Sequence, residues 1–305
     1  MLNNYIKIAR PDHWFKNIFM VPGMIMALFY NQFDFSSVSW ILVIAGVLAT
    51  CLIASANYVI NEWLDLEFDK YHPVKKNRPA VAAKLDVRIV YAEYVLLALV
   101  GLSLSYFISL RFFLVELLLL VMGFMYNVKP IRTKDKVYLD VLSESVNNPI
   151  RFVLGWFLMG VTFLPPSSIL IAYWMGGAFL MATKRFAEYR FIGDTTIAGL
   201  YRHSFKVYTE EKLLISTVFY ALCSSFFLAI FLIKHRIELL FSFPFLALLF
   251  AWYLHLGFEE NSIVQTPEKL FRKKSFVLYT IFLFLLLIVL LGFDMPFLDW
   301  FIINY

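Results

Sequence analysis

Four polar side chains recur at every fourth position where a long apolar segment ends. They are Asn57, Asn61, Asp65 and Asp69, and Glu62 directly follows Asn61. Because residues four apart lie one turn above each other on a helix, the oxygens of the four side chains would share one face. Carboxylate and amide oxygens are the ligands that Mg²⁺ prefers, and one or two carboxylates usually hold it together with substrate phosphates. The spacing therefore favours a site for a metal ion and a diphosphate.

A run of cations follows these acids within a short stretch of chain. Lys75, Lys76 and Arg78 would neutralise phosphate oxygens that the metal does not reach. Arginine adds a bidentate geometry that lysine lacks. The alternative interpretation is a solvated acidic helix end followed by an ordinary basic loop.

The composition excludes a soluble globular domain. The chain of 305 residues is 61% hydrophobic and 16% charged, with 33 Phe and a mean hydropathy of +0.73. Apolar runs long enough to cross a hydrocarbon core of ~30 Å recur along it. We predict an all-α integral membrane protein with nine transmembrane helices in a single polytopic domain, residues 1–305. The predicted spans cover residues 17–30, 39–61, 89–110, 112–126, 139–164, 167–184, 213–233, 239–256 and 276–293.

Lysine and arginine concentrate in alternate loops, which predicts the orientation of the chain. Short cytoplasmic loops carry the positive excess in membrane proteins, and most of the 27 cations lie before the first span or after an even-numbered span. We therefore predict a multi-pass protein of the cytoplasmic (inner) membrane with the N-terminus in the cytoplasm and the C-terminus outside. Cytoplasmic cap loops near residues 62–88, 127–138 and 185–212 would border a cavity that faces the cytoplasm.

Other possible functions have little support in the sequence. Cys51 and Cys223 fall inside predicted spans, which argues against a disulfide and against a thiolate metal site. No cleavable signal peptide is apparent. The net charge of +5 lies almost wholly at the predicted cytoplasmic face, where anionic headgroups of the lipid bilayer attract it. A nucleic-acid partner is not needed to explain it.

Two further segments carry charge toward the membrane. Tyr126 and Lys129 close one predicted helix, and Arg151 lies within the next span. An intramembrane arginine is costly enough to indicate a function, with a phosphate or the nearby acids Asp140 and Glu144 as its partner. The alternative is a structural salt bridge between spans.

The sixth predicted span ends in a second group of charged residues. Lys184, Arg185 and Glu188 lie at its boundary, on the same predicted side of the membrane as Asp65 and Asp69. A single cytoplasmic cavity could then collect both groups. The alternative is an ordinary exposed helix end, since pairs four apart stabilise such ends by only ~0.2–0.5 kcal/mol each.

The segment from Asn61 to Pro79 resembles the first signature of the UbiA superfamily of intramembrane prenyltransferases. That signature is Asn-Asp-x-x-Asp-x-x-x-Asp followed by Arg-Pro, and a fold of nine spans fits the superfamily. Three further segments resemble one branch, which contains the polyprenyl-phosphate phosphoribosyltransferases. They are ARPDHWFKN (residues 9–17), TKRFAEYR (residues 183–190) and RHSFKVYTEEKL (residues 202–213).

The resemblance implies a role for each matching residue. Asn61, Asp65 and Asp69 would form the Mg²⁺ and diphosphate site, with Glu62 in place of the usual Asp as a further metal ligand. Asn61, Asp65 and Asp69 would thereby also be the catalytic residues. The residues expected to bind substrate are Lys16, Asn17, Arg78, Tyr126, Lys129, Arg151, Lys184, Arg185 and Glu188.

The chain also departs from the family pattern. Glu62 is one methylene longer than the usual Asp, and Lys84 stands where a glycine often follows the Arg-Pro-x-x-Ala run. The second acidic motif of the aromatic prenyltransferases, two aspartates four apart after span six, is absent; Lys184, Arg185 and Glu188 occupy its place. This difference argues against a prenyl diphosphate site with two acidic clusters.

The resemblance implies a Mg²⁺-dependent transferase. In the leading hypothesis, 5-phosphoribosyl diphosphate loses diphosphate and a polyprenyl phosphate attacks its anomeric carbon. In the alternative, a prenyl group moves from prenyl diphosphate to an aromatic or other acceptor. A transporter is the rival from another class, but its polar groups should lie near the bilayer midplane, whereas here they crowd one predicted face.

Overall fold

The computed structural model describes residues 2–83 and 85–301, so Lys84 lies outside the described chain. Within the described residues the regular elements are helices, and none is a strand. Backbone contacts group them into two compact units. The first unit contains residues 2–165 and 192–209, and the second contains residues 166–191 and 210–301. The expectation of a single domain over residues 1–305 stays a prediction.

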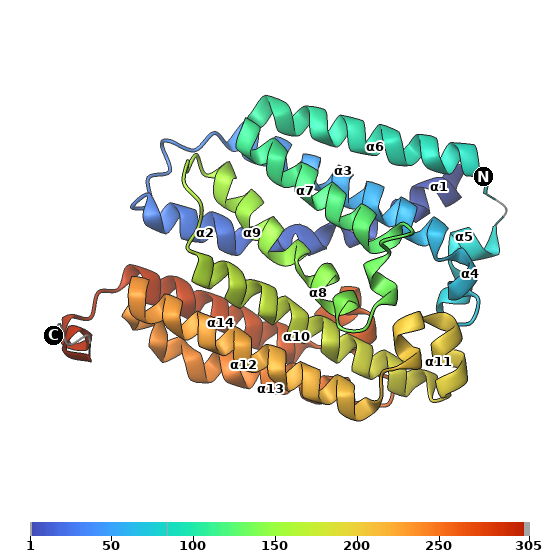
Figure 1. The fold of residues 1–305 in the computed structure, drawn as a ribbon. Helices are drawn as coiled ribbons and strands as arrows, with labels where there is room; N and C mark the ends of the chain where they lie inside the picture. The colour runs from blue at the N-terminus through green and yellow to red at the C-terminus, as the bar shows by residue number, and fades with distance from the viewer. Residues whose placement is uncertain (1, 84, 302–305) are drawn as a thin grey trace. The chain divides into compact units, whose positions relative to one another are not determined.

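The first unit is built around α3 (Trp40–Leu64), the longest of its helices. α6 (Val87–Ile108) and α7 (Leu110–Asn127) pack along α3, and α2 (Val21–Tyr30) packs along α9 (Asn147–Leu158) (Figure 1). The other elements are α1 (Leu2–Ile8), η1 (Pro11–Met20), α4 (Leu66–Asp69), η2 (Lys75–Asn77), α5 (Pro79–Ala82), η3 (Thr133–Asp135), α8 (Leu139–Ser145), α11 (Thr195–Tyr201) and η4 (His203–Lys206).

Glycines let the backbones of the first unit approach closely. A Cβ atom at Gly23 of α2 would lie 1.9 Å from the carbonyl oxygen of Phe152, and one at Gly155 would lie 2.0 Å from that of Met20. Side chains cannot shift to relieve a clash with backbone atoms. These two positions therefore fix α2 and η1 against α9, which is where Asn17 and Arg151 lie.

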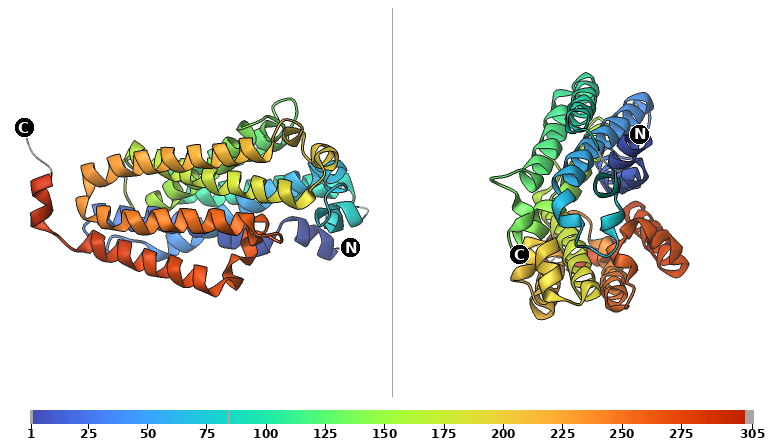
Figure 2. Two further views of the ribbon diagram at one scale, coloured as in Figure 1. Left: turned by 90° about the horizontal axis from the view of Figure 1, so that it is seen from below. Right: turned by 90° about the vertical axis from the view of Figure 1, so that its right-hand side faces the viewer.

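The second unit consists mainly of four long helical segments. α10 (Ser167–Ile192) is followed, after the return of the chain from the first unit, by α12 (Glu210–His235), α13 (Phe243–Phe258) and α14 (Lys274–Gly292). α12, α13 and α14 run side by side (Figure 2). The rings of Phe179 and Phe250 stack with centroids 4.5 Å apart and join α10 to α13. The shorter elements are η5 (Ile237–Ser242), η6 (Ile263–Gln265), η7 (Pro267–Arg272) and η8 (Pro296–Phe301).

Six helical segments of the described chain are long and apolar enough to cross a membrane. They are α3, α6, α7, α12, η5 with α13, and α14. The remaining three predicted spans fold as helices that do not meet that standard. The span predicted at 17–30 is split between η1 and α2, and the one at 139–164 is split between α8 and α9 and ends at Leu158. α10 is long enough, but its second half is charged. The count of nine spans stays a prediction.

Candidate active site

The four-residue spacing of the acids survives the end of the helix that carries them. α3 ends at Leu64, yet the backbone N–H of Asp65 donates to Asn61 O at 3.0 Å and that of Asp69 donates to Asp65 O at 2.8 Å. The turn therefore continues through the short helix α4. Asp65 and Asp69 consequently stay on one side of the chain, as the sequence predicts.

Asp65 and Asp69 line the same small pocket of the first unit. Its volume is about 20 Å³, room for roughly one water molecule. A bound diphosphate would need the surrounding side chains to move apart. The lining consists of Asp65, Phe68, Asp69, Arg132, Lys134, Asp135, Tyr201 and Arg202.

Two cations from the loop after α7 neutralise Asp65. Arg132 Nη2 lies 2.9 Å from Asp65 Oδ1, and Lys134 Nζ forms an ion pair with the same oxygen. Burial would raise the pKa of the Asp65 carboxyl, but the charges of Lys134 and Arg132 outweigh burial and lower that pKa. Asp65 is therefore held as a carboxylate, the form that binds a metal ion.

Lys134 connects the acid pocket to the interface of α3 and α7. Lys134 is 3% exposed and its ammonium donates to Asn127 Oδ1 at 2.7 Å, and Asn61 Nδ2 donates to the same oxygen at 2.6 Å. Burial lowers the pKa of Lys134 to about 8, against the opposing effect of Asp65. Asn61 thus contacts the pocket through Asn127 and Lys134 and does not line it.

Arg132 adopts a backbone conformation that side-chain-bearing residues rarely take. Its φ is 27°, in the left-handed region. Its guanidinium is held by three acceptors: Asp65 Oδ1 at 2.9 Å, Asp135 Oδ2 at 2.9 Å and Asn127 O at 2.8 Å. Strained residues persist where the surroundings over-determine them, and they cluster at ligand clamps and active sites.

Asp69 has its own cation from the segment that follows α4. Asp69 is 1% exposed, and its carboxylate pairs with the Arg78 guanidinium. Lys75, three residues before Arg78, donates to the Tyr201 hydroxyl. The basic run predicted to follow the acids therefore folds back over them.

The segment of residues 201–208 closes the pocket and is anchored by a buried carboxylate. Asp140 is fully buried and accepts hydrogen bonds from Ser204 Oγ at 3.0 Å and Tyr208 Oη at 2.8 Å. Arg202 lies 3.4 Å from the same carboxylate. Since Tyr201 and Arg202 also line the pocket, Asp140 positions part of its wall.

The chemistry of this donor set fits Mg²⁺. Within residues 2–83 and 85–301 no group of three or more His, Cys, Asp or Glu side chains could hold a metal ion alone. Mg²⁺ does not need such a cage, because one or two carboxylates plus substrate phosphates usually bind it. Asp65 and Asp69 provide the carboxylates in a single pocket, beside cations suited to phosphate.

Glu62, predicted as a metal ligand, lies outside the lining of this pocket. Its side chain is 1% exposed and pairs with Arg10 at 2.6 Å, and Glu62 Oε1 accepts the backbone N–H of Ala80 at 3.3 Å. Lys16, predicted near the first helix, places its ammonium 5.4 Å from the centre of the Tyr58 ring. Glu62 and Lys16 thus join the N-terminal segment to α3.

Asn17 and Arg151 come together, at a different depth from Asp65. Arg151 Nε donates to Asn17 Oδ1 at 2.9 Å, and Asn17 Nδ2 lies 3.1 Å from Cys51 Sγ. Cys51 precedes Asp65 by about four helical turns, which corresponds to roughly 20 Å along α3. The predicted site residues of the first unit therefore divide into two levels along α3.

Tyr126 and Lys129 have different surroundings at the end of α7. The Tyr126 hydroxyl donates to Glu144 Oε2 at 2.8 Å, and the Lys134 ammonium lies 5.6 Å from the centre of its ring. Lys129 is exposed and, in the part of the chain that the structure describes, forms no ion pair or hydrogen bond through its side chain. Arg132 and Lys134 are the cations from this loop that line the pocket.

Lys184, Arg185 and Glu188 lie on α10 in the second unit. Arg185 Nη1 and Glu188 Oε2 form a buried ion pair at 3.2 Å, with exposed side-chain fractions of 2% and 1%. Their assignment to the same cavity as Asp65 and Asp69 stays a prediction.

Sequence reasoning missed Arg132, Lys134 and Arg202 as pocket residues. Arg132 and Lys134 belong to the predicted cap loop 127–138, and Arg202 belongs to the predicted cap loop 185–212. Nothing in residue type separates Lys134 from Lys129. The one available signal was that Arg202 lies in a segment with a family resemblance.

Comparisons with known proteins identify the family. The UbiA prenyltransferase family model matches residues 19–277. The decaprenyl-phosphate phosphoribosyltransferase of Mycolicibacterium smegmatis is 29% identical over 214 residues, which cover 70% of this chain and 65% of that protein. The protein of the same name from Mycobacterium tuberculosis is 28% identical over 211 residues, covering 68% and 67%. The chain thus matches about two thirds of the length of these curated relatives.

A solved structure shares the fold. It is a UbiA homolog from Archaeoglobus fulgidus bound to GPP and Mg²⁺, with a TM-score of 0.69 and 20% sequence identity. The superposition covers 93% of this chain and 99% of that one. The six membrane-length helices agree with an integral membrane protein. The chain belongs to the UbiA prenyltransferase family.

Proposed function

We propose that this chain is a Mg²⁺-dependent intramembrane transferase that moves phosphoribose from 5-phosphoribosyl diphosphate to a polyprenyl phosphate. The observation that carries the proposal is the pocket that contains both Asp65 and Asp69 and is walled by Arg132, Lys134 and Arg202. In this pocket, carboxylates suited to a metal ion lie next to cations suited to phosphate. The names of the mycobacterial relatives support the choice of substrates.

The reaction requires little acid–base chemistry from the protein. An oxygen of the acceptor phosphate is already a nucleophile, so it attacks the anomeric carbon while the bond from that carbon to the diphosphate oxygen breaks. The diphosphate leaves with the electron pair of that bond. Mg²⁺ held by Asp65 and Asp69 would stabilise the charge that develops on the leaving group.

The cations that pair with Asp65 and Asp69 would have two successive partners in this mechanism. Lys134 and Arg132 neutralise Asp65, and Arg78 neutralises Asp69, when no phosphate is bound. If Asp65 and Asp69 held a metal ion, these cations would be released to bind the oxygens of the diphosphate. There they would stabilise the same charge that develops on the leaving diphosphate.

The remaining predicted residues have supporting parts in the proposal. Asn61 orients Lys134 through Asn127, and Glu62 ties the N-terminal segment to α3 through Arg10. We propose that the pocket opens to the cytoplasm, with the N-terminus on that side and the acceptor tail between helices in the bilayer. The other residues that the family resemblance implies as substrate-binding are Lys16, Asn17, Tyr126, Lys129, Arg151, Lys184, Arg185 and Glu188.

The second candidate is prenyl transfer from a prenyl diphosphate to an aromatic or other acceptor. It is favoured by the fold neighbour from Archaeoglobus fulgidus, which was solved with GPP and Mg²⁺. The pocket of Asp65 and Asp69 would then hold the diphosphate of the lipid instead of that of the sugar.

Two parallel incubations separate these candidates. Membranes containing the protein receive labelled 5-phosphoribosyl diphosphate with polyprenyl phosphate, or labelled prenyl diphosphate with 4-hydroxybenzoate. Label in a lipid-linked ribose supports phosphoribose transfer. Label in the aromatic product alone overturns it in favour of prenyl transfer, and Asp65→Asn membranes provide the blank for both.

A further inference from the structure

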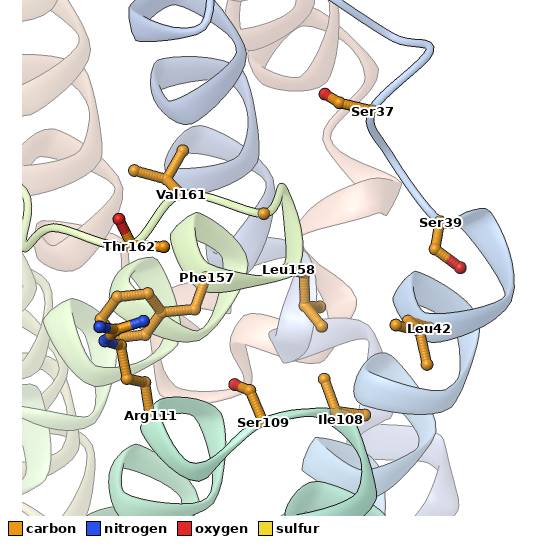
Figure 3. A pocket seen from close by; sticks show the side chains of 11 residues that line it. Ser37, Ser39, Leu42, Ile108, Ser109, Arg111, Phe157, Leu158, Val161 and Thr162 are labelled. Atoms are coloured by element: carbon orange, nitrogen blue, oxygen red, sulfur yellow. The ribbon is translucent and has the colours of Figure 1, made fainter.

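A second pocket lies at the opposite end of the first unit from the acids. It is bounded by the start of α3, the end of α6, the start of α7 and the end of α9 (Figure 3). Since α3 has 25 residues, its two ends are separated by about 37 Å, more than the ~30 Å of a hydrocarbon core. If Asp65 lies at one membrane surface, this pocket lies at the level of the headgroups of the other leaflet.

The lining of this outer pocket is amphipathic. Hydroxyl groups and one guanidinium form its polar part, and aliphatic and aromatic side chains form the rest. Figure 3 shows Arg111 rising from the first turn of α7 toward Phe157 and Thr162. The lining residues with polar side chains are Ser37, Ser39, Ser109, Arg111 and Thr162, and those with apolar ones are Leu42, Ile108, Phe157, Leu158 and Val161.

Arg111 brings a charge that nothing in the pocket balances. Its side chain has no ion pair or hydrogen bond within the described residues, and no acid is among the residues that line the pocket. The nearest acids in the sequence are engaged elsewhere, since Glu116 contacts Thr50 and Asp34 accepts from Ser36 at 2.6 Å. The outer pocket therefore carries a net positive charge.

The hydroxyl groups near Arg111 differ in whether they accept a hydrogen bond at the start of a helix. Ser109 caps α7 by accepting the N–H of Phe112 at 3.1 Å, whereas Ser39 at the start of α3 makes no such cap. Ser39 and Thr162 thus have hydroxyls without a partner in the described chain. An arginine with free hydroxyls is a set of donors suited to phosphate oxygens.

The size of the pocket limits what it can enclose. Its volume is about 200 Å³, below the roughly 300–1,000 Å³ of sites that surround a whole small molecule. A headgroup fits, while a longer molecule has to continue outside. At Gly160, where φ is 78°, an added Cβ would meet no heavy atom within 4 Å beyond Gly160 and its chain neighbours, so the wall is open there.

We propose that the outer pocket binds the phosphate of an anionic phospholipid, with the acyl chains along the apolar helix surfaces. We propose a membrane lipid as the occupant instead of a free phosphate for two reasons. About half of the lining is apolar, and Leu42 and Ile108 belong to membrane-length helices, α3 and α6. This site is independent of the transferase proposal. It assigns a role to Arg111, whose side chain forms no ion pair or hydrogen bond within the described residues.

The test measures lipid binding to the purified full chain in detergent by native mass spectrometry. Phosphatidylglycerol is titrated onto the wild type and onto Arg111→Gln, and we expect roughly tenfold weaker binding to the variant. Phosphatidylcholine, whose choline cation offsets its phosphate, should bind the two proteins alike. Lys234→Gln removes another exposed cation at a helix end, one without an ion pair among the described residues, and should bind phosphatidylglycerol like the wild type.

A second variant keeps the arginine and fills the space. Thr162→Phe alters an exposed loop residue, so the fold should be retained and phosphatidylglycerol binding should fall. Thermal unfolding checks the fold of each variant. Equal phosphatidylglycerol binding to the wild type, Arg111→Gln and Thr162→Phe would overturn the site. Competition by glycerol 1-phosphate at the same concentrations as the lipid would overturn the lipid as its occupant.

Discussion

The two polar levels of the first unit differ in how their charges are balanced. At the end of α3, Asp65 and Asp69 are both paired with cations from neighbouring segments. About four turns deeper, the hydrogen-bond acceptors of Arg151 among the described residues are neutral: Asn17 Oδ1 and the backbone oxygen of Asn147. The first level can exchange one set of partners for another, whereas the second holds one fixed arrangement.

This difference has a physical consequence for ligand binding. Cations that already neutralise carboxylates near a surface can be transferred to a phosphate at little cost, because both states leave every charge paired. A buried arginine with neutral partners gains nothing from such an exchange with a ligand roughly 20 Å away. We therefore expect chemistry at the first level and structural effects at the second.

The largest effect should follow from Asp65→Asn. The substitution removes a metal-binding oxygen and leaves Arg132 and Lys134 without their shared acid. We expect transfer to fall more than about 100-fold, since even partners behind metal ligands cost 10- to 100-fold when removed. Initial rates at saturating Mg²⁺ measure it. Asp135→Asn is the matched control from the same pocket, and equal losses in both variants would contradict a special role for Asp65.

Substitution of two lysines in the loop after α7 should reduce the transfer rate less than Asp65→Asn does, and to different extents. Lys134→Gln removes a buried ammonium that contacts Asp65, whereas Lys129→Gln changes an exposed side chain without an ion pair. We expect roughly a 10- to 100-fold loss of rate in the first variant, as for removal of a partner behind a metal ligand, and less than about twofold in the second. The reverse order would mean that the family resemblance, and not the geometry, identifies the working lysine.

Binding of Mg²⁺ without substrate should be weak, because the carboxylates of Asp65 and Asp69 are already paired with cations. Calorimetric titration of Mg²⁺ into the wild type should give little heat, and addition of diphosphate should strengthen metal binding. In Arg132→Gln one competing cation is gone, so Mg²⁺ alone should bind several-fold more tightly while diphosphate binds more weakly. A change of the same sign for both ligands would contradict the exchange of partners.

The sequence predicted the acid stripe well because its cause is local. Four-residue spacing and helix geometry bring Asn61, Asp65 and Asp69 to one side, and backbone hydrogen bonds extend that spacing past the end of α3. The all-helical membrane fold was predictable from composition for the same reason. Burial of apolar surface follows from residue type alone.

The partners of these acids depend on contacts between distant segments. Lys134 meets Asp65 across the loop after α7, and Tyr208 meets Asp140 from a cap more than sixty residues later. The number of charges in the loop does not show whether Lys129 or Lys134 contacts Asp65, because that depends on the strained turn at Arg132. The depth of Arg151 was equally hidden, because it depends on the close approach of η1 and α9 at Gly155.

The smallest effect on catalysis should come from Asn17→Ala, which tests the deeper level. The substitution removes the side-chain acceptor of Arg151 Nε and leaves a buried donor unpaired, so thermal stability should fall. The Mg²⁺ concentration that gives half the maximal rate should change less than about twofold, because Asn17 contacts Cys51, which lies roughly 20 Å along α3 from Asp65. Asn261→Ala, at an exposed position, is the control for stability. A tenfold shift in the Mg²⁺ dependence at unchanged stability would instead join the two levels into one site, since only a residue near the metal could act on its affinity without acting on the fold.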